Sequence, residues 1–195
     1  LHGSSAASDV YKRQALISED SEIIIRDVGI NPTRAALINV LKEMGGNIEF
    51  TKVKQVSNEE VCNILVKNSQ LKGADIGGDI IPSLIDEIPI LSIAASFADG
   101  KSKISDIGEL RVKESDRLNA ISKGLDAIGI KNCTDNTSIT IEGKTGYIEQ
   151  IDNIKSFDDH RIAMSFLVAG LRSKRGITVN NLSLIHISEP TRPSS

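Results

Sequence analysis

Short apolar segments alternate along the chain with longer segments of helical periodicity. Residues 21–28 (SEIIIRDV) are short and β-branched, which predicts a buried strand. Residues 31–46 begin with Asn before Pro and close at Gly45, which predicts a helix. One face of this helix carries four apolar side chains at helical spacing, namely Leu37, Val40, Leu41 and Met44.

The same alternation continues through the rest of the chain. We expect strands at residues 47–50, 59–73 and 102–107, and a helical region at residues 81–100 that is closed by Gly100. The opening of the 59–73 segment is also compatible with a helix. Amphipathic helices that alternate with strands pack under sheets, so the pattern predicts an α/β or α+β fold.

Two pairs of segments resemble each other. TRAALINVLKEMGGNIEF shares with DRLNAISKGLDAIGIKNC the order of Arg, helix, apolar pair, Gly and strand, so that Arg34 corresponds to Arg117 and Gly45 to Gly129. ILSIAASFADGKSKI is echoed by RIAMSFLVAGLRSKRGI. The copies lie about 70–84 residues apart, which is longer than the period of solenoid repeats. We therefore expect about two copies of a βαβαββ unit, the second of them incomplete.

The two ends of the chain carry related sequences. DVYKRQ, residues 9–14, can be encoded by DNA whose reverse complement encodes LSLIHI, the sequence of residues 182–187. Inverted copies of one DNA element are typical of sequencing adapters, so we expect residues 1–14 and 182–195 to be adapter-derived tails around a body at residues 15–181. The alternative is a natural polar N-terminus and a short C-terminal strand.

Composition excludes several classes of function. The chain has 39% hydrophobic and 25% charged residues and a net charge of -3, without runs of Lys or Arg, so a nucleic-acid partner is not expected. Cys62 and Cys133 are isolated, which indicates neither a zinc site nor a disulfide. No apolar run reaches the ~20 residues that span a bilayer. A cytoplasmic protein without a membrane partner is the resulting expectation.

Charged residues gather at the expected starts of helices. Asp86 and Glu87 precede an apolar helix. An acid at the start of a helix stabilises it through the helix dipole by about 0.3–1 kcal/mol. His160 and Arg161 follow two acids at another helix start, where the dipole opposes cations unless an anion or a local Asp–Arg pair is present.

The stretch KESDR, residues 113–117, crowds two acids and two bases together. Lys113 and Arg117 are four residues apart and would share one face of a helix, with Glu114 beside them. Helix starts that carry Arg and Lys bind oxyanions, and carboxylates move protons, so the pattern indicates a site for a phosphorylated or carboxylated small molecule.

Four motifs in this order resemble the 5-enolpyruvylshikimate-3-phosphate synthase family in its glyphosate-insensitive bacterial form: NPTR, DEIP, ELRVKESDR and DHRIAMSF. The resemblance covers residues 20–181 and corresponds to most of the family's C-terminal domain. It implies the inside-out α/β barrel of the enolpyruvyltransferases, built from repeated βαβαββ units. It also implies transfer of the enolpyruvyl group of phosphoenolpyruvate to the 5-hydroxyl of shikimate 3-phosphate, through a tetrahedral ketal, with release of phosphate and without metal or organic cofactor. The parent enzyme is expected to be a monomer.

The resemblance also implies roles for individual residues. Asp86 would accept the hydroxyl proton and bind shikimate 3-phosphate, Lys113 would contact the reacting hydroxyl and the phosphate, and Glu114 would exchange the methylene proton. Phosphoenolpyruvate would be held by Arg117 and Arg161, with His160 alongside. Two further acids, Asp116 and Asp159, would orient the arginines. The NPTR motif and the turn at Gly45 are explained by packing and capping alone.

Two other hypotheses remain open at this point. One is the related UDP-N-acetylglucosamine enolpyruvyltransferase, which would not be expected to combine KESDR with DHRIAM. The other is a non-catalytic α/β module that binds a phosphorylated ligand, although Asp86 and Glu114 would bring nothing to a pure anion binder. Because the family's N-terminal domain is absent from the sequence, we expect the isolated chain to be inactive.

Overall fold

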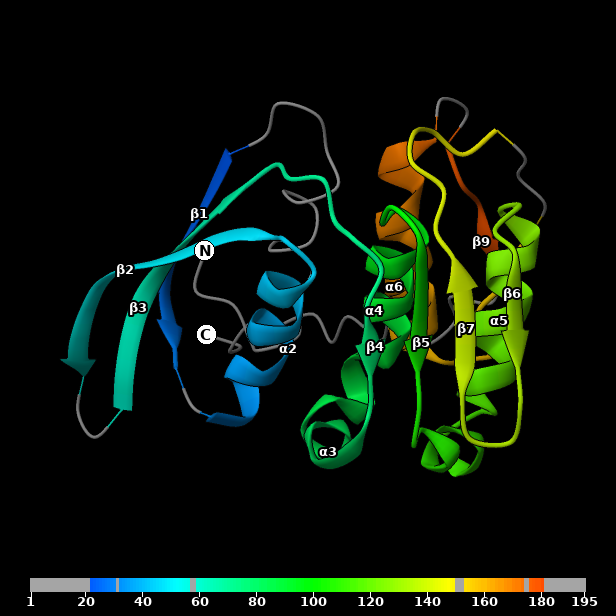
Figure 1. Cartoon of the computed structure of the whole chain (residues 1–195), viewed down its shortest axis with the longest axis horizontal. Coiled ribbons are helices and arrows are strands. Elements are labelled where there is room, and N and C mark those ends of the chain that lie inside the picture. Colours follow the sequence, from blue (N-terminus) through cyan, green and yellow to red (C-terminus); the bar gives the residue numbers. More distant parts are fainter. Residues whose placement is uncertain (1–21, 31, 57–58, 150–152, 174–175, 181–195) are drawn as a thin grey trace, which may run out of the picture.

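The structure is a computed structural model that describes residues 22–30, 32–56, 59–149, 153–173 and 176–180. The expected adapter tails, residues 1–14 and 182–195, lie outside the described residues, as does Asn31 of the NPTR motif. A three-stranded sheet with one helix stands beside a larger body of helices and two further sheets (Figure 1). This arrangement confirms the expected mixture of α and β structure.

The middle of the chain forms one complete βαβαββ unit. Its sheet has the strand order β4-β5-β7-β6, in which β4 and β5 are parallel and the other neighbours are antiparallel. The unit comprises β4 (Asp75–Ile76), α3 (Ile81–Leu84), α4 (Ile88–Ser96), β5 (Lys101–Ile104), α5 (Arg117–Ala127), β6 (Asn132–Thr134) and β7 (Ile139–Glu142).

Partial units flank the complete one. On the N-terminal side lie β1 (Glu22–Gly29), α2 (Pro32–Glu43), β2 (Asn47–Val56) and β3 (Glu59–Lys67). Their sheet order, β1-β3-β2, is antiparallel and repeats the order β5-β7-β6. On the C-terminal side, β8 (Ile154–Lys155), α6 (His160–Ala169) and β9 (Val179–Asn180) repeat β4, α4 and β5, again with a parallel strand pair. The repeat is therefore confirmed, but the expectation of two copies with only the second incomplete is wrong: the complete copy lies between two partial ones in the described residues.

Equivalent helices end in equivalent turns. After α2, Gly45 has a φ of 91°, and the amide of Gly46 donates to the carbonyl of Leu41. After α5, Gly129 has a φ of 73°, and the amide of Ile130 donates to the carbonyl of Leu125. Each turn needs a residue in the left-handed region, which glycine adopts without steric cost. The aligned glycines of the sequence repeat are thus explained by the same helix-ending turn.

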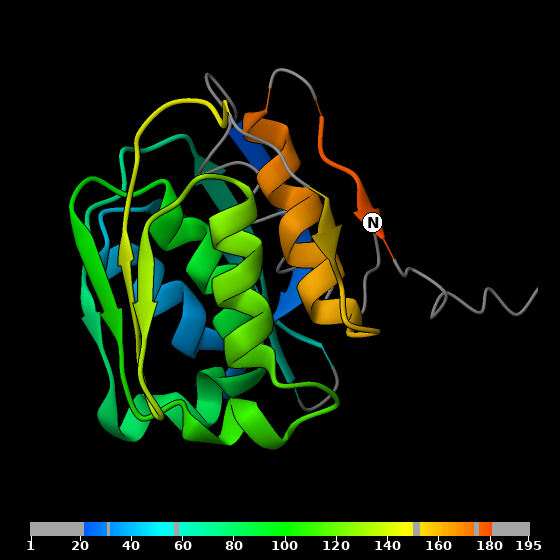
Figure 2. The same ribbon diagram turned by 90° about the vertical axis from the view of Figure 1, so that its right-hand side faces the viewer.

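Helix α4 lies at the centre of the body and is buried at every position, as expected for a helix that is apolar all round. It packs against both α5 and α6, which lie side by side (Figure 2). The approach of α5 to α6 depends on Gly124, because a Cβ there would lie 2.1 Å from the Cζ atom of Phe166. The three helices that begin at the charged motifs are therefore packed against one another.

Several element boundaries differ from the sequence expectations. The helical region at residues 81–100 is interrupted by a 3₁₀ turn, η2 (Ile85–Glu87), and α4 ends at Ser96. The segment at residues 59–73 is a strand from its opening and stops at Lys67, and the strand at residues 102–107 stops at Ile104. Four short strands were not predicted individually, because runs of two to four residues give little periodicity: β4, β7, β8 and β9.

Candidate active site

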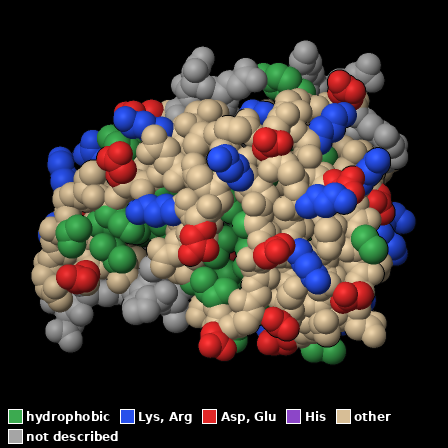
Figure 3. Space-filling model, viewed as in Figure 1, with side chains coloured by type: hydrophobic (Ala, Val, Ile, Leu, Met, Phe, Trp, Pro, Cys, Tyr) green, Lys and Arg blue, Asp and Glu red, His purple; other side chains and the backbone are tan. Residues whose placement is uncertain are grey.

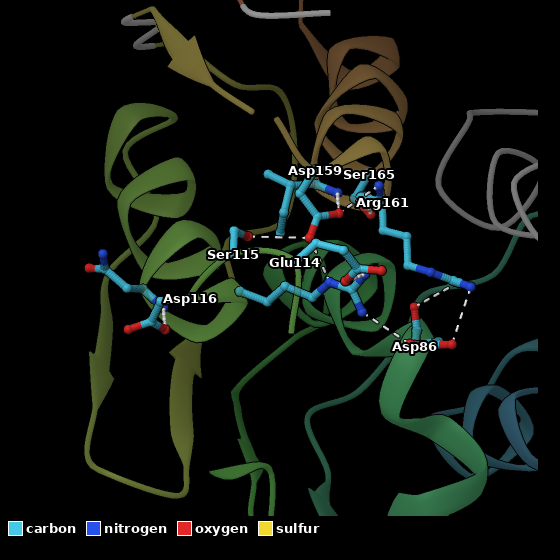
Figure 4. A network of polar contacts seen from close by, with 10 residues as sticks. Asp86, Glu114, Ser115, Asp116, Asp159, Arg161 and Ser165 are labelled. Atoms are coloured by element: carbon cyan, nitrogen blue, oxygen red, sulfur yellow. Dashed lines mark hydrogen bonds and ion pairs between the residues drawn. The ribbon is translucent and has the colours of Figure 1, made fainter. Parts of the chain in front are cut away.

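The starts of three helices bring five charged side chains together: Asp86, Glu114, Arg117, Asp159 and Arg161 (Figure 4). Asp86 lies in η2, directly before α4. Glu114 lies in the segment that leads into α5, and Arg117 is the first residue of that helix. Asp159 caps α6, and Arg161 lies in its first turn. We call these five residues the arginine cluster.

Arg117 is the buried centre of the cluster. Its side chain is only 1% exposed, and each of its three nitrogens faces a different carboxylate. Nε donates to Asp159 at 2.6 Å, Nη1 to Asp86 at 3.0 Å and Nη2 to Glu114 at 2.5 Å. Burial alone would lower the pKa of Arg117. The hydrogen bond and charge of Asp159, the charge of Glu114 and the hydrogen bond of Asp86 outweigh this effect, so the pKa is raised above its usual value.

Asp86 joins the two arginines. Besides its contact with Arg117, its Oδ2 atom lies 3.2 Å from Nη2 of Arg161, and its backbone carbonyl accepts a bond from Nη1 of Arg161 at 3.1 Å. The carboxylate is half exposed, so it faces solvent while both cations hold it. This geometry orients Asp86 and holds two guanidinium groups on one carboxylate.

Asp159 fixes the base of the cluster. Its Oδ1 atom accepts bonds from the amides of Arg161 and Ile162, while Oδ2 accepts from Arg117 and from the Ser115 hydroxyl. Burial raises the pKa of Asp159, but the hydrogen bond and charge of Arg117 and the two amide bonds lower it, and the net shift is downward. One buried acid therefore caps α6 and orients the arginine that begins α5.

The turn before Asp159 is conformationally costly. Phe157 and Asp158 have φ values of 54° and 57°, which lie in the left-handed region. That region costs an ordinary L-residue roughly 1–2 kcal/mol. The surrounding contacts of Asp159 hold the turn in this conformation and deliver its carboxylate to the cluster.

Lys113 and Arg117 do not share one helix face, in contrast to the sequence expectation. Lys113 ends the 3₁₀ turn η3 (Gly108–Val112) in an extended conformation, and α5 begins only at Arg117. The Lys113 side chain pairs with Glu109. His160 is the exposed first residue of α6, and among the described residues no hydrogen bond or ion pair joins it to the arginine cluster. The structure thus gathers Asp86, Glu114, Arg117 and Arg161, but not Lys113 or His160, through direct contacts.

Asp116 does not orient either arginine of the cluster, which corrects the role inferred from sequence. It caps α5 by accepting from the amide of Asn119 and pairs with Arg111 at 3.1 Å. Arg111 also donates to the carbonyls of Asn136 and Asp135 in the turn between β6 and β7. This link anchors the segment that carries Glu114.

Ser115, Glu109 and Arg111 were missed in the sequence analysis. Ser115 has no helical register that would point it at Asp159, 44 residues away. Their positions within ELRVKESDR were the only available signal, because the segment between η3 and α5 has no regular periodicity.

The described residues hold neither a metal-binding group of side chains nor a membrane-spanning helix. They contain no group of three or more His, Cys, Asp or Glu side chains arranged to hold a metal ion. None of their helices has the length and apolar character to cross a membrane. The arginine cluster itself combines carboxylates open to solvent with guanidinium groups, a combination suited to proton transfer on an anionic ligand.

Comparisons with known proteins identify the family of this chain. The family model described as EPSP synthase (3-phosphoshikimate 1-carboxyvinyltransferase) matches residues 4–192. The 3-phosphoshikimate 1-carboxyvinyltransferase of Thermoanaerobacter sp. (strain X514) is 46% identical over 176 residues, covering 90% of this chain and 41% of the relative. That of Geobacter sulfurreducens is 43% identical over 189 residues, covering 97% of this chain and 44% of the relative. The chain thus spans about two fifths of the length of these relatives.

Solved structures show the same fold. The EPSP synthase of Acinetobacter baumannii superposes with a TM-score of 0.84 and 39% identity, covering 90% of this chain and 41% of that one. The enolpyruvyl transferase NikO from Streptomyces tendae has a TM-score of 0.64 at 19% identity, which supports the fold alone. The inside-out enolpyruvyltransferase architecture expected from the motifs is therefore confirmed. The family that the motifs suggested is therefore the one that matches, and the chain belongs to the EPSP synthase family.

Proposed function

We propose that this chain supplies half of the active site of an enzyme that transfers the enolpyruvyl group of phosphoenolpyruvate to the 5-hydroxyl of shikimate 3-phosphate. The observation that carries the proposal is the arginine cluster, in which two solvent-facing carboxylates, Asp86 and Glu114, lie on the same guanidinium group. Membership of the EPSP synthase family supports the choice of reaction. A module that only binds anions would be weakened by these acids, since they repel its ligand.

In the proposed mechanism, Asp86 takes the proton from the 5-hydroxyl as its oxygen attacks C2 of phosphoenolpyruvate. Glu114, in its protonated form, gives a proton to the methylene carbon, which produces the tetrahedral ketal. Asp86 then passes its proton to the oxygen of the departing phosphate, and return of a methyl proton to Glu114 restores the double bond in the product. Both side chains are thereby returned to their starting states. Each acid acts on a different atom, so the two can work without exchanging a proton directly.

The cations have binding roles in this proposal. Arg161, which is partly exposed, holds phosphoenolpyruvate together with Arg117, and His160 lies alongside at the start of α6. Lys113 binds the phosphate and the reacting hydroxyl of shikimate 3-phosphate, which requires it to leave Glu109. We also propose, from the family, that the enzyme needs no metal or organic cofactor and acts as a monomer in the cytoplasm.

The test is a chimera in which residues 22–180 replace the matching segment of the Thermoanaerobacter enzyme. Phosphate release should require both phosphoenolpyruvate and shikimate 3-phosphate. Asp86→Asn and Glu114→Gln should each lower kcat by roughly 10²–10⁴-fold, the usual contribution of a positioned acid or base. The matched control is Asp99→Asn, which changes an exposed acid after α4 and should leave kcat unchanged.

Near-normal kcat in both carboxylate variants would refute their acid–base roles. A chimera that folds and binds both ligands without releasing phosphate would favour the non-catalytic binding module instead.

A further inference from the structure

The cations of the proposed site lie beneath their own carboxylate partners. The Arg117 side chain is 1% exposed, whereas the side chains of Asp86 and Glu114, which cover it, are 48% and 60% exposed. Lys113 and Glu109 stand in the same relation, at 25% and 59%. Ion pairs elsewhere on the described surface, such as Lys101 with Glu142, have both partners open to solvent.

This arrangement leaves no route for an anionic ligand to Arg117. Three of the five N–H groups of its guanidinium, one on each nitrogen, donate to a carboxylate, and the whole side chain is only 1% exposed. A phosphate or carboxylate group can reach Arg117 only if one of these carboxylates leaves. The burial of Arg117 therefore conflicts with a direct grip on phosphoenolpyruvate unless the cluster rearranges.

The three carboxylates differ in how firmly they are held. Asp159 is buried and accepts four hydrogen bonds, including two that cap α6. Asp86 is held by both arginines, and its backbone carbonyl is bonded as well. Glu114 is the most exposed of the three carboxylates, and it pairs with Arg117. The cost of removal is therefore smallest for Glu114.

We infer that Glu114 is an internal anion that occupies the ligand position on Arg117 and is exchanged for the phosphate or carboxylate group of the substrate. The inference rests on the proposed function and deepens it. When the anion takes Nη2 of Arg117, the Glu114 carboxylate is released into the site. Binding of the substrate anion and liberation of the proton-transferring acid are then one event, so Glu114 is free to act only when a substrate is present.

The exchange can be tested on the full 195-residue chain by NMR of its arginine side chains during titration with inorganic phosphate. Phosphate should shift the Nη signals of Arg117. Its Nε signal should stay in place, because the bond to Asp159 is retained. Glu114→Gln should bind phosphate roughly three- to tenfold more tightly than wild type, since the competing carboxylate of an exposed pair is removed.

Two control variants separate exchange from a general effect of charge. Glu149→Gln removes a more exposed acid that pairs with Lys144 at 3.9 Å rather than with a residue of the cluster. Glu142→Gln removes an acid that pairs with Lys101 at 2.9 Å, and neither partner belongs to the proposed site. Exchange at Arg117 requires a larger gain in affinity for Glu114→Gln than for either control. Equal affinities in Glu114→Gln and the controls would overturn the inference.

Nη signals of Arg117 that do not respond to phosphate, in wild type and in Glu114→Gln alike, would also overturn it. The titration involves no turnover. Failure of the exchange would thus leave the activity of the chimera intact, and an inactive chimera would leave the titration result standing.

Discussion

Asp159 is central to the geometry of the site, because among the described residues it is the buried carboxylate that connects the starts of α5 and α6. Its two oxygens divide the work, one capping α6 and the other holding Arg117 and Ser115. An asparagine would keep the shape and part of the hydrogen bonding but would remove the charge that Arg117 needs. Loss of this charge should therefore reduce the stability of the fold as well as disturb the binding site.

We expect Asp159→Asn to lower the free energy of unfolding at neutral pH by about 1–3 kcal/mol, the range for a buried hydrogen bond to a charged group. Because folding lowers the pKa of Asp159, its charge stabilises the protein fully above the unfolded pKa of about 3.9. That contribution disappears as the pH falls through the lower folded value. Urea unfolding from pH 7 downward should therefore show a constant difference that shrinks below about pH 4.

Asp116→Asn is the matched control, since Asp116 also caps a helix but pairs with a partly exposed arginine. It should destabilise less than Asp159→Asn. A difference between Asp159→Asn and wild type that persists undiminished in acid would contradict the role of the charge.

Substitutions of Arg161 and Asp86 should affect different kinetic parameters although the two side chains contact each other. In the chimera, Arg161→Ala removes a proposed grip on phosphoenolpyruvate, so KM for that substrate should rise. Asp86→Asn removes a group that acts in the transition state, so kcat should fall with a much smaller change in KM. Steady-state phosphate release, with phosphoenolpyruvate varied at saturating shikimate 3-phosphate, measures both. An unchanged KM in Arg161→Ala would argue against the assigned grip.

Among the elements, the contact of α5 with α6 sets the distance between the segments that carry Arg117 and Arg161. An alanine at Gly124 would gain up to about 1 kcal/mol in helix propensity, but its Cβ would overlap the ring of Phe166. Overpacking typically costs about 1–3 kcal/mol, so we expect Gly124→Ala to lower the free energy of unfolding despite the better propensity. Urea denaturation measures the sign.

The double variant Gly124→Ala/Phe166→Leu should recover part of the loss, because the smaller side chain makes room for the new methyl group. A single variant more stable than wild type would show that α5 and α6 can move apart freely.

The sequence predicted long and strongly periodic elements well and short ones poorly. Helix α2 and the apolar body of α4 followed from periodicity, and the glycine turns after α2 and α5 followed from the repeat. The 3₁₀ turn η2, which interrupts the helical region and carries Asp86, could not be predicted from periodicity. Charges at helix starts indicated one anion site, and direct contacts join Asp86, Arg117 and Arg161 there. Lys113, which the same reasoning included, pairs with Glu109 instead. The extended segment at Lys113 was not expected, since local spacing cannot show where a helix begins.

At the scale of the whole molecule, the described residues form one complete repeat between two partial ones. Hydrophobic side chains gather on the surface near the three-stranded sheet, whereas acids and bases are mixed over much of the remaining surface in this view (Figure 3). The exposed large hydrophobic side chains in that sheet are Ile24, Val53 and Val56. In the complete repeat a parallel strand, β4, lies beside β5, but among the described strands β1 has no such neighbour.

Because one repeat is complete and two are partial, we expect different parts of the molecule to open locally at different rates. Amides of α4, β5 and β7 lie in the complete repeat or on the fully buried helix, so their hydrogen exchange should require an opening close to global unfolding. Amides of β8 and β9, which form a two-stranded sheet, should exchange through much smaller fluctuations. Native-state hydrogen exchange would measure this order, and equal protection of β9 and α4 would contradict it. Local opening of β8 and β9 would leave α6 packed against α4 and α5, so Arg117 and Arg161 would be presented together even while the neighbouring strand pair opens.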